Sequence, residues 1–437
     1  MQKVAFHTLG CKVNQYETEA ITEQFIASGY QVVGFEDKAD IYIVNTCTVT
    51  NIADKKSRKM LSKAKKLNNE SVVVAVGCYV QVAHEQLEQI PFIDVLIGNT
   101  HKNQVVEIVE KFIESNQSYN SIESVHKDIV YEELSIKSQQ SKTRTTIKIQ
   151  DGCNQYCTYC IIPYTRGIIR SRQPISVIDE VRVLASKGYK EIILTGIHLG
   201  SYGKDLEDIE LVDLVEELDK IKGIERIRLG SLEPNYITEG ILERLIKCPS
   251  VCNHFHLSMQ SGSDNVLKRM KRRYTTAEYY EKVQLIRKFY KEAAITTDVI
   301  VGFPMETVEE ENETFNFVKK IGFSELHIFK YSMRKGTVAA NMKPQINGTV
   351  KHLRSRRLTD LAISLKTSYL KSFLNKQLEV LLEDDVIIDG VSYMTGYSNN
   401  YIKVYINSEN NGNLSHNQIV KTTMKELFEE GLLATAY

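Results

Sequence analysis

The sequence lacks a long apolar segment and an excess of charge of either sign. No run approaches the roughly 20 apolar residues of a membrane-spanning helix, and residues 1–7 lack the apolar core and cleavage site of a secretory signal. Lys and Arg total 55, as do Asp and Glu, so the net charge is zero and a polyanion site requires local clustering. We therefore expect a cytoplasmic protein with no membrane partner, in which thiols stay reduced.

Six of the eight cysteines fall into two groups of three. Cys153, Cys157 and Cys160 form a compact C-x3-C-x2-C loop, whereas Cys11, Cys47 and Cys78 are far apart and each follows the end of an expected strand. Three thiolates are able to hold a four-iron cluster and leave one iron open for a substrate or cofactor. Two such groups indicate chemistry that uses two open irons.

The 437 residues are enough for about three domains. In the first, apolar strands are expected at 4–9, 41–46, 71–76 and 92–97, with helices between them. Asn14 with Glu17, and Asn51 with Asp54, have the spacing of helix N-caps. Continuous apolar strands alternating with helices indicate a parallel sheet covered on both faces. Because ligands of such sheets bind beyond the carboxyl ends of the strands, Cys11, Cys47 and Cys78 are expected to converge there.

The alternation weakens over 117–140, which we interpret as a linker with some extended structure, with a boundary near Ser141. It then resumes with expected strands at 145–150, 191–195, 226–230, 254–259, 294–301 and 325–331, about six βα units of a partial barrel. A basic helix at 351–373 follows. Short strands at 379–382, 386–388, 391–397 and 401–405 predict a small all-β barrel. The expected domains are 1–116, 141–374 and 375–437.

Both cysteine groups have alternative interpretations. The compact loop would also suit zinc, although structural zinc usually takes four protein ligands and no fourth ligand has convincing spacing. Cys11, Cys47 and Cys78 would also be explained as buried thiols, but all three follow strands. Cys248 and Cys252 are expected to be reduced structural thiols.

The stretch Cys153-Asn154-Gln155-Tyr156-Cys157-Thr158-Tyr159-Cys160-Ile161-Ile162-Pro163, followed by Arg166-Gly167 and Arg170-Ser171-Arg172, resembles the central signature of the radical S-adenosylmethionine (SAM) methylthiotransferases. The resemblance covers essentially the whole chain. It implies an α/β fold: an open parallel α/β domain, a partial (β/α)6 radical-SAM barrel and a C-terminal TRAM-type β-barrel. The segment Thr8-Leu9-Gly10-Cys11-Lys12-Val13-Asn14-Gln15 is most similar to the branch that methylthiolates threonylcarbamoyladenosine in tRNA.

The resemblance implies two [4Fe-4S] clusters. Cys153, Cys157 and Cys160 would hold the cluster that binds SAM and cleaves it to a 5′-deoxyadenosyl radical. Cys11, Cys47 and Cys78 would hold an auxiliary cluster that carries the sulfur to be inserted, and a second SAM would supply the methyl group.

SAM contacts are expected at strand ends, where the alternative is that a residue only shapes a turn. The candidates are Tyr159, Thr195, Gly196, Ser231, Glu233, Gln260, Val301 and Gly302. The chain departs from the family at Met305, which stands where glycine is common. Because Met disfavours a positive φ, we expect a locally different turn there.

Three basic clusters are candidates for RNA contact, with a solvated helix face as the alternative. They are residues 55–66; Arg269, Lys271, Arg272 and Arg273; and Lys351, Arg354, Arg356 and Arg357. The third is favoured because it adjoins the expected RNA-binding barrel. Tyr393, Tyr397 and Tyr401 would either stack on bases or belong to the core. His254 and His256 share a strand face and are expected in a polar network more than in a metal site.

The predicted function is conversion of N6-threonylcarbamoyladenosine, at position 37 beside the anticodon, to its 2-methylthio form. The expected partners are tRNA, an electron donor such as a flavodoxin-type reductant, and a sulfur source. One alternative is action on isopentenyladenosine in tRNA or on a ribosomal protein. An alternative of another class is a non-catalytic, metal-stabilised RNA-binding protein, which the C-x3-C-x2-C loop disfavours.

Overall fold

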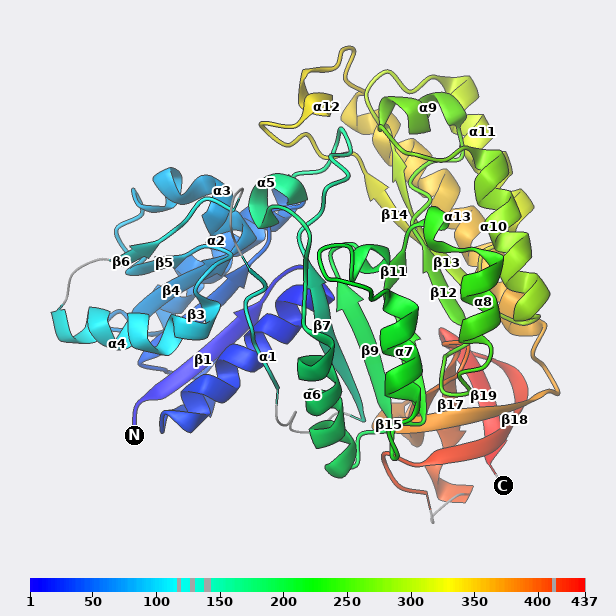
Figure 1. The fold of residues 1–437 in the computed structure, drawn as a ribbon, viewed down its shortest axis with the longest axis horizontal. Helices are drawn as coiled ribbons and strands as arrows, with labels where there is room; N and C mark the ends of the chain where they lie inside the picture. Colours follow the sequence, from blue (N-terminus) through cyan, green and yellow to red (C-terminus); the bar gives the residue numbers. More distant parts are fainter. Residues whose placement is uncertain (116–118, 126–129, 137–142, 411–413, 437) are drawn as a thin grey trace.

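A computed structural model describes residues 1–115, 119–125, 130–136, 143–410 and 414–436. Figure 1 shows an N-terminal α/β domain beside a central barrel, with a small β-barrel beneath the central one. Ser141, near which the sequence places a boundary, lies outside the described residues. None of the helices in these ranges is long and apolar enough to cross a membrane.

The N-terminal domain is a parallel six-stranded sheet with the order β2-β1-β3-β4-β5-β6. Buried side chains of α1 and α4 pack on one face, and those of α2 and α3 pack on the other. The strands are β1 Lys3–Thr8, β2 Gln31–Val33, β3 Ile41–Thr46, β4 Val72–Gly77, β5 Val95–Ile97 and β6 Tyr119–Ser121. The helices are α1 Lys12–Ala27, α2 Asn51–Leu67, α3 Cys78–Leu87 and α4 Val105–Ser115.

Two local predictions for this domain differ from the structure. Cys11, and not Asn14, is the N-cap of α1, because Asn14 is buried inside the helix and its amide donates to two strand-end carbonyls. Thr50, and not Asn51, caps α2, with its side chain accepting from the Ala53 N–H. The linker expected at 117–140 contains extended structure, as predicted, in β6, which pairs with β5 and extends the sheet.

The central domain has a parallel strand at each of the six predicted positions, namely β7 Arg144–Asp151, β9 Glu191–Gly196, β10 Arg226–Leu229, β12 His254–Leu257, β13 Ala294–Val301 and β14 Glu325–Lys330. They form two four-stranded sheets, β10-β9-β7-β8 and β11-β12-β13-β14. The short β8 Arg170–Ser171 is antiparallel to β7, and β11 Ser231–Leu232 directly follows β10 and pairs with β12. The strands therefore curve into a partial barrel with β8 and β14 as its edges.

Helices cover the outside of this barrel (Figure 1). They are α6 Pro174–Ser186, α7 Leu211–Asp219, α8 Glu239–Leu245, α10 Thr276–Phe289, α11 Val308–Ile321 and α13 Gly348–Lys371. The other helices of this domain are α5 Ile162–Arg166, α9 Asp264–Arg269 and α12 Val338–Asn341. Single-turn 3-10 helices lie at Lys102–Gln104, Leu199–Ser201, Pro234–Tyr236 and Ser408–Asn410.

The C-terminal domain is a closed five-stranded barrel with the order β15-β16-β17-β19-β18. The two short strands expected at 379–388 are one strand, β15 Gln377–Ile388, whose pairing with β16 shifts register between Leu382 and Asp384. The barrel continues with β16 Val391–Ser398 and β17 Lys403–Asn407, the latter two residues later than predicted. It closes with β18 Ile419–Phe428 and β19 Gly431–Ala436, which the sequence pattern did not reveal.

The C-terminal barrel seals the end of the central barrel at which its parallel strands begin. The buried Arg228 bonds to Glu191 and to the Asn399 carbonyl, 3.1 Å away. Tyr401 stacks on Tyr397 with 4.9 Å between ring centroids and also lies beneath the Arg228 guanidinium. Tyr397 and Tyr401 therefore contact the neighbouring domain, a role that neither of their predicted alternatives included.

Candidate functional site

The compact cysteine loop connects β7 to α5. The Gln155 N–H lies 3.4 Å from the Cys153 sulfur, and the Cys160 N–H donates to the Cys157 carbonyl at 3.0 Å. Gly152 enters the loop with φ 71°, and a Cβ there would lie 1.8 Å from the Ile168 carbonyl oxygen. Only glycine therefore permits the chain to turn tightly at this point.

The three distant cysteines converge at one edge of the N-terminal sheet, as the strand-end rule predicts. The ends of β1, β3 and β4 are neighbours, with Thr8 opposite Asn45 and Thr46 opposite Gly77. Cys47 and Cys78 directly follow their strands, and Cys11 begins α1. A Cβ built on Gly10 would lie 3.0 Å from the Cys47 sulfur, so the Cys11 and Cys47 loops touch.

A cavity of about 350 Å³ lies between the compact cysteine loop and the segment that follows Cys47. Cys153, Cys157 and Cys160 line it, and so do Val49 and Thr50, which closely follow Cys47. The N-terminal domain therefore forms part of the wall of the barrel's cavity. The separation of the two groups is set by how the domains dock.

The spacing of the sulfurs favours clusters over single ions. Zinc–sulfur bonds of about 2.3 Å bring ligand sulfurs within about 4 Å of one another. Among the described residues, the one group of three or more metal-binding side chains with all ligand atoms within 4.8 Å contains no cysteine. Each cysteine group is thus more open than a zinc site, as a four-iron cube requires.

All eight cysteines are free of disulfides. Burial raises the pKa of Cys47 and Cys160 to about 12 and that of Cys153 to about 11. Without a bound cation these thiols are protonated at neutral pH, so ligation would release protons. Both groups offer three soft donors and fit an iron–sulfur cluster with one iron left open.

Arg272 is the main cation beside the compact cysteine loop. Its guanidinium lies 3.4 Å from the Cys157 sulfur, donates to Glu233 at 2.5 Å and to the Ser258 carbonyl at 3.2 Å. Its side chain is 5% exposed, which removes it from the RNA-contact cluster in which the sequence placed it. A basic run gives no signal that one member turns inward.

The predicted SAM contacts divide into two sets. Tyr159, Ser231, Glu233 and Gln260 line the cavity. Thr195, Gly196, Val301 and Gly302 are not among its lining residues, and their role stays a prediction. Val301 belongs to the hydrophobic core, a Cβ on Gly196 would meet Gln150, and the Gly302 N–H donates to Glu306.

Sequence analysis missed several lining residues. The polar ones include Gln155, His198, Ser258 and Asp298 within the barrel, and Thr50, Lys330, Tyr331 and Ser332 nearer the N-terminal domain. Ile197 and Ile300, which also line the cavity, are adjacent to predicted positions. His198 and Gln155 have their Nε2 atoms 3.4 Å apart. Ile197 and His198 follow a predicted strand directly, and this position was the signal that could have identified them as lining residues.

Met305 takes φ 65°, the left-handed conformation that glycine favours, and its N–H donates to the Pro344 carbonyl at 3.0 Å. The expectation that Met avoids a positive φ here is therefore wrong. Its side chain is 42% exposed, so the strain is confined to the backbone.

The favoured basic cluster is mostly engaged within the chain. Arg354 is buried in an ion pair with Glu306, Arg357 pairs with Glu311, and the Lys351 ammonium donates to the Tyr331 carbonyl. Arg356 is exposed. RNA contact by this cluster stays a prediction, and the geometry supports it best for Arg356.

A buried ionic network connects the N-terminal domain to residues that flank the compact cysteine loop. The Glu17 carboxylate on α1 contacts Lys102 at 2.7 Å, Lys148 at 2.8 Å and Arg166 at 2.8 Å. Asp151, two residues before Cys153, contacts Lys148 at 2.6 Å and Arg166 at 3.0 Å. Each of these side chains is at most 5% exposed.

Two asparagines link this network to the distant cysteines. Asn14 accepts from Arg166 at 2.8 Å and has its Oδ1 3.7 Å from the Cys11 sulfur. Asn99 accepts from Lys102 at 2.9 Å and has its amide nitrogen 3.5 Å from the Cys78 sulfur. These contacts explain why the signature arginine Arg166 is fully buried.

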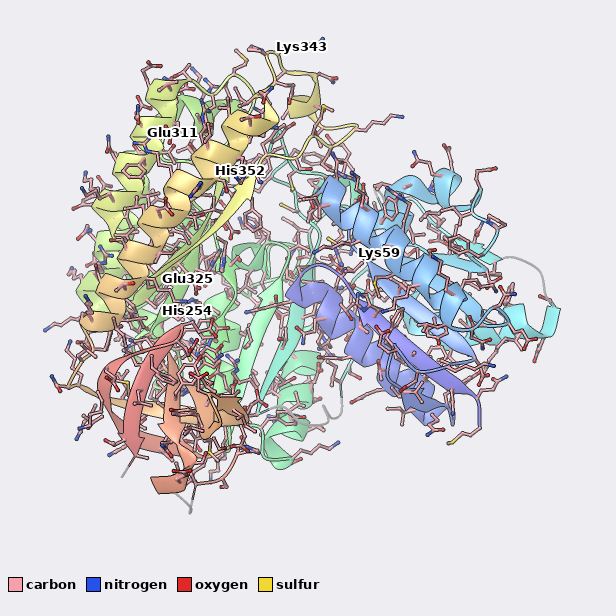
Figure 2. The ribbon with its side chains drawn as sticks, turned by 180° about the vertical axis from the view of Figure 1, so that it is seen from behind. Lys59, His254, Glu311, Glu325, Lys343 and His352 are labelled. Carbon is pink, nitrogen blue, oxygen red and sulfur yellow. The ribbon has the colours of Figure 1, made fainter. Side chains whose placement is uncertain are left out.

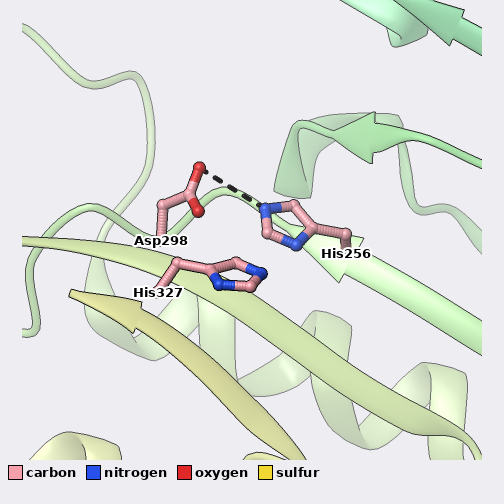
Figure 3. A group of neighbouring side chains, drawn as sticks. All are labelled: His256, Asp298 and His327. Atoms are coloured by element: carbon pink, nitrogen blue, oxygen red, sulfur yellow. Dashed lines mark ion pairs between the residues drawn. The ribbon is translucent and has the colours of Figure 1, made fainter. Parts of the chain in front are cut away.

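The barrel interior holds a second polar cluster, shown in Figure 3. His256 lies 3.5 Å from the Asp298 carboxylate, and its ring stacks on that of His327. Thr296 bridges His254 and His256, with its hydroxyl 3.1 and 2.9 Å from their rings, as the polar-network prediction expects. Cys248 and Cys252 are buried free thiols, as predicted, and do not line this cavity.

Family comparisons cover both halves of the site. Residues 3–98 match the model described as Uncharacterized protein family UPF0004, and residues 147–318 match the Radical SAM superfamily. Threonylcarbamoyladenosine tRNA methylthiotransferase MtaB of Bacillus subtilis is 44% identical over 92% of this chain and 90% of its own length. The protein of that name from Thermotoga maritima is 34% identical over 99% and 97%. The tRNA-2-methylthio-N(6)-dimethylallyladenosine synthase of B. subtilis is 38% identical over 88% and 76%.

A solved structure has the same fold at low sequence identity. The radical SAM methyltransferase TsrM of Kitasatospora setae, with cobalamin and a [4Fe-4S] cluster bound, matches with a TM-score of 0.58 at 14% identity over 78% of this chain and 74% of that chain. This likeness concerns the fold alone. Given the sequence relatives and both family models, the chain belongs to the radical SAM methylthiotransferase family and is an enzyme of that type.

Proposed function

We propose that this enzyme converts N6-threonylcarbamoyladenosine at position 37 of tRNA, beside the anticodon, to the 2-methylthio form. The observation that carries the proposal is the shared cavity, in which the compact cysteine loop faces the segment that closely follows Cys47. The relatives named for threonylcarbamoyladenosine include the one at 44% identity. The relative named for dimethylallyladenosine, at 38%, supports the reaction type with another base substituent.

Cys153, Cys157 and Cys160 would hold the [4Fe-4S] cluster that binds SAM, and Cys11, Cys47 and Cys78 would hold the auxiliary [4Fe-4S] cluster. When bound, these groups supply the radical, the sulfur and the methyl group of the methylthiolation. Arg272 would orient Cys157 and hold Glu233 at the cavity wall. The apolar lining around Tyr159 and Ile300 would exclude water from the reacting base.

We assign domain roles accordingly: 1–116 carries the auxiliary site, 141–374 the SAM site, and 375–437 a TRAM-like RNA-binding barrel. The reaction also requires an electron donor, such as a flavodoxin-type reductant, and a source that restores the transferred sulfur. SAM contacts are proposed first for Tyr159, Ser231, Glu233 and Gln260, because these line the cavity.

The test is mass spectrometry of tRNA nucleosides from cells with and without the gene. Loss of 2-methylthio-threonylcarbamoyladenosine, with accumulation of its precursor, is expected. If that nucleoside persists while the 2-methylthio form of isopentenyladenosine disappears, the substrate assignment is wrong.

Variants separate the two cysteine groups. Cys157→Ala is expected to abolish formation of 5′-deoxyadenosine from SAM, whereas Cys47→Ala is expected to retain it and lose methylthiolation. Cys248→Ala, which removes a buried thiol outside the cavity, is the matched control and should retain both. Methylthiolation by the Cys47→Ala protein would contradict the division of labour.

A further inference from the structure

Helix α2 carries a row of exposed lysines. Lys55, Lys59 and Lys66 are spaced by four and seven residues, which places them on one face of a helix. Their side chains span about 16 Å at 1.5 Å per residue. All three are exposed, and no carboxylate in the described part of the chain pairs with them. We name these three residues the α2 stripe.

Two of the other lysines of the same helix have partners within the chain, whereas Lys56 is exposed. Lys63 pairs with Glu36, and Lys65 lies 4.0 Å from the Asp94 carboxylate and donates to the Ser71 carbonyl at 2.9 Å. The contrast shows that acidic partners are present around α2 but are absent along the stripe. The stripe is therefore an unbalanced line of positive charge, suited to a polyanion.

The helix begins at the mouth of the shared cavity. Thr50 caps α2 and also lines the cavity. The Asn51 N–H donates at 3.0 Å to the Ser332 hydroxyl, which lines the cavity from the opposite domain. Figure 2 shows α2, with Lys59 on it, on the near side of the N-terminal domain in that view, and α13 on the near side of the barrel.

Apolar side chains surround this mouth and are unusually open to solvent. Val49 and Phe329 line the cavity and are each 48% exposed. Ile52 and Met333, which are next in sequence to the bonded Asn51 and Ser332, are 64% and 50% exposed. We name these four residues the apolar rim. An unstacked nucleobase is a flat partner for such side chains.

We propose that the anticodon loop binds with its sugar–phosphate backbone along the α2 stripe and its target base over the apolar rim. This inference rests on the proposed function and specifies where the substrate enters. An acidic electron-donor protein would also be attracted by lysines, but it gives no reason for an apolar rim around the cavity. In the third basic cluster, Arg354, Arg357 and Lys351 already have partners within the chain. The α2 stripe is therefore the better candidate for contact with the RNA backbone.

The experiment compares two double variants of the full-length protein, loaded with iron and matched in iron content. Lys55→Gln with Lys59→Gln removes two stripe charges, and Lys63→Gln with Lys65→Gln removes two internally paired charges of the same helix. The probe is a labelled anticodon stem-loop RNA carrying threonylcarbamoyladenosine, whose affinity is measured by fluorescence anisotropy at several salt concentrations.

The stripe variant is expected to lower the slope of log affinity against log salt by about 1.4, at about 0.7 for each single-strand phosphate contact. The paired-lysine variant should leave the slope unchanged. Phe329→Ala should weaken binding by at least about fivefold without changing the slope, because stacking is not an ionic contact.

The outcomes distinguish the two proposals. If the unaltered protein does not bind this RNA, the proposed function fails. If it binds, but both double variants have the same slope, only the α2 assignment is overturned. If the stripe variant keeps its RNA affinity but needs more reduced flavodoxin for SAM cleavage, the α2 stripe is instead a binding surface for the electron donor.

Discussion

Replacing Glu17 by glutamine tests whether the buried ionic network holds the two cysteine-bearing domains together. Glu17 is fully buried and contacts Lys102, Lys148 and Arg166, which come from three different segments. With Asp151 and Arg170, the network contains four cations and two carboxylates. The cations are Lys102, Lys148, Arg166 and Arg170, and the carboxylates are Glu17 and Asp151. Its net charge of +2 becomes +3 in the variant, at unchanged side-chain size.

The expected loss of stability is large because Glu17, the shared partner of several buried ion pairs, is neutralised while its cationic partners stay buried. Breaking a single buried pair in this way costs about 3–5 kcal/mol, and the free energy of unfolding should fall by at least the lower figure. Burial alone would raise the pKa of Glu17, but Arg166, Lys102 and Lys148 hold it well below its usual range. This stabilisation is present above the unfolded pKa near 4.5 and is lost as pH falls through the folded pKa.

The assay is urea unfolding at pH 7 and at a series of acidic pH values, monitored for the N-terminal and central domains. The Glu17→Gln protein should be less stable at pH 7 and should show a weaker loss of stability in acid. Glu36→Gln, which removes a 69% exposed carboxylate paired with Lys63, should change stability by less than about 1 kcal/mol. A Glu17→Gln protein as stable as the unaltered one at pH 7 would refute the reasoning.

Three further substitutions test the site and the fold. Gly152→Ala should prevent the compact cysteine loop from forming, since its Cβ would lie 1.8 Å from a carbonyl oxygen, whereas Gly240→Ala, with open space around it, should not. The measurement is the iron and sulfide content per chain after reconstitution, and equal content in the two variants would contradict this prediction. Met305→Gly should raise the free energy of unfolding by up to about 1 kcal/mol, because it relieves a left-handed backbone; a lower urea midpoint would contradict this. Arg228→Met should speed hydrogen exchange at residues 398–399, where the guanidinium bonds two carbonyls, and unchanged exchange would disprove that contact's importance.

The sequence predicts the central barrel well because its signal is local. Its parallel strands are short segments with successive or alternating apolar residues, bounded by helices and turns, and all six lie at the expected positions. The last two strands of the C-terminal barrel gave no comparable signal. The stretch Lys425-Glu426-Leu427-Phe428-Glu429-Glu430 resembles a helix surface. The strand state of Glu426, Leu427 and Phe428 depends on their pairing with β19.

The failed N-cap at Asn14 shows how a nonlocal contact imitates a local motif. Asn followed by Glu three residues later has capping-box spacing. In the structure, neither side chain caps the helix. Glu17 binds Lys102 and Arg166, which are 85 and 149 positions away, and Asn14 accepts from Arg166, 152 positions away. Local spacing contains no information about such distant charges, so the motif was given the wrong role.

Strand-end positions predict the edge of the barrel at which ligands bind, but not the direction of each side chain. Successive residues of a strand point to opposite faces. A prediction that is wrong by one position therefore names a side chain of the core instead of one that lines the cavity. Val301 was predicted and belongs to the core, whereas its neighbour Ile300 lines the cavity. Thr195 and Gly196 were predicted, whereas Ile197 and His198 line it.

The network explains how two sites built from different domains keep a fixed separation. Moving the domains apart would expose a cluster of charges with a net charge of +2 that bond almost entirely to one another across the interface. The same movement would separate Asn99 from the Thr165 carbonyl on α5, 2.7 Å away, and Asn14 from Arg166 at the end of that helix. These asparagines also contact Cys78 and Cys11. Each asparagine therefore links one of the distant cysteines to the helix that follows the compact cysteine loop. The proposed reaction would join a group from each site on one base and would require such a connection. The surplus of buried positive charge would also favour an anionic thiolate cluster bound beside it.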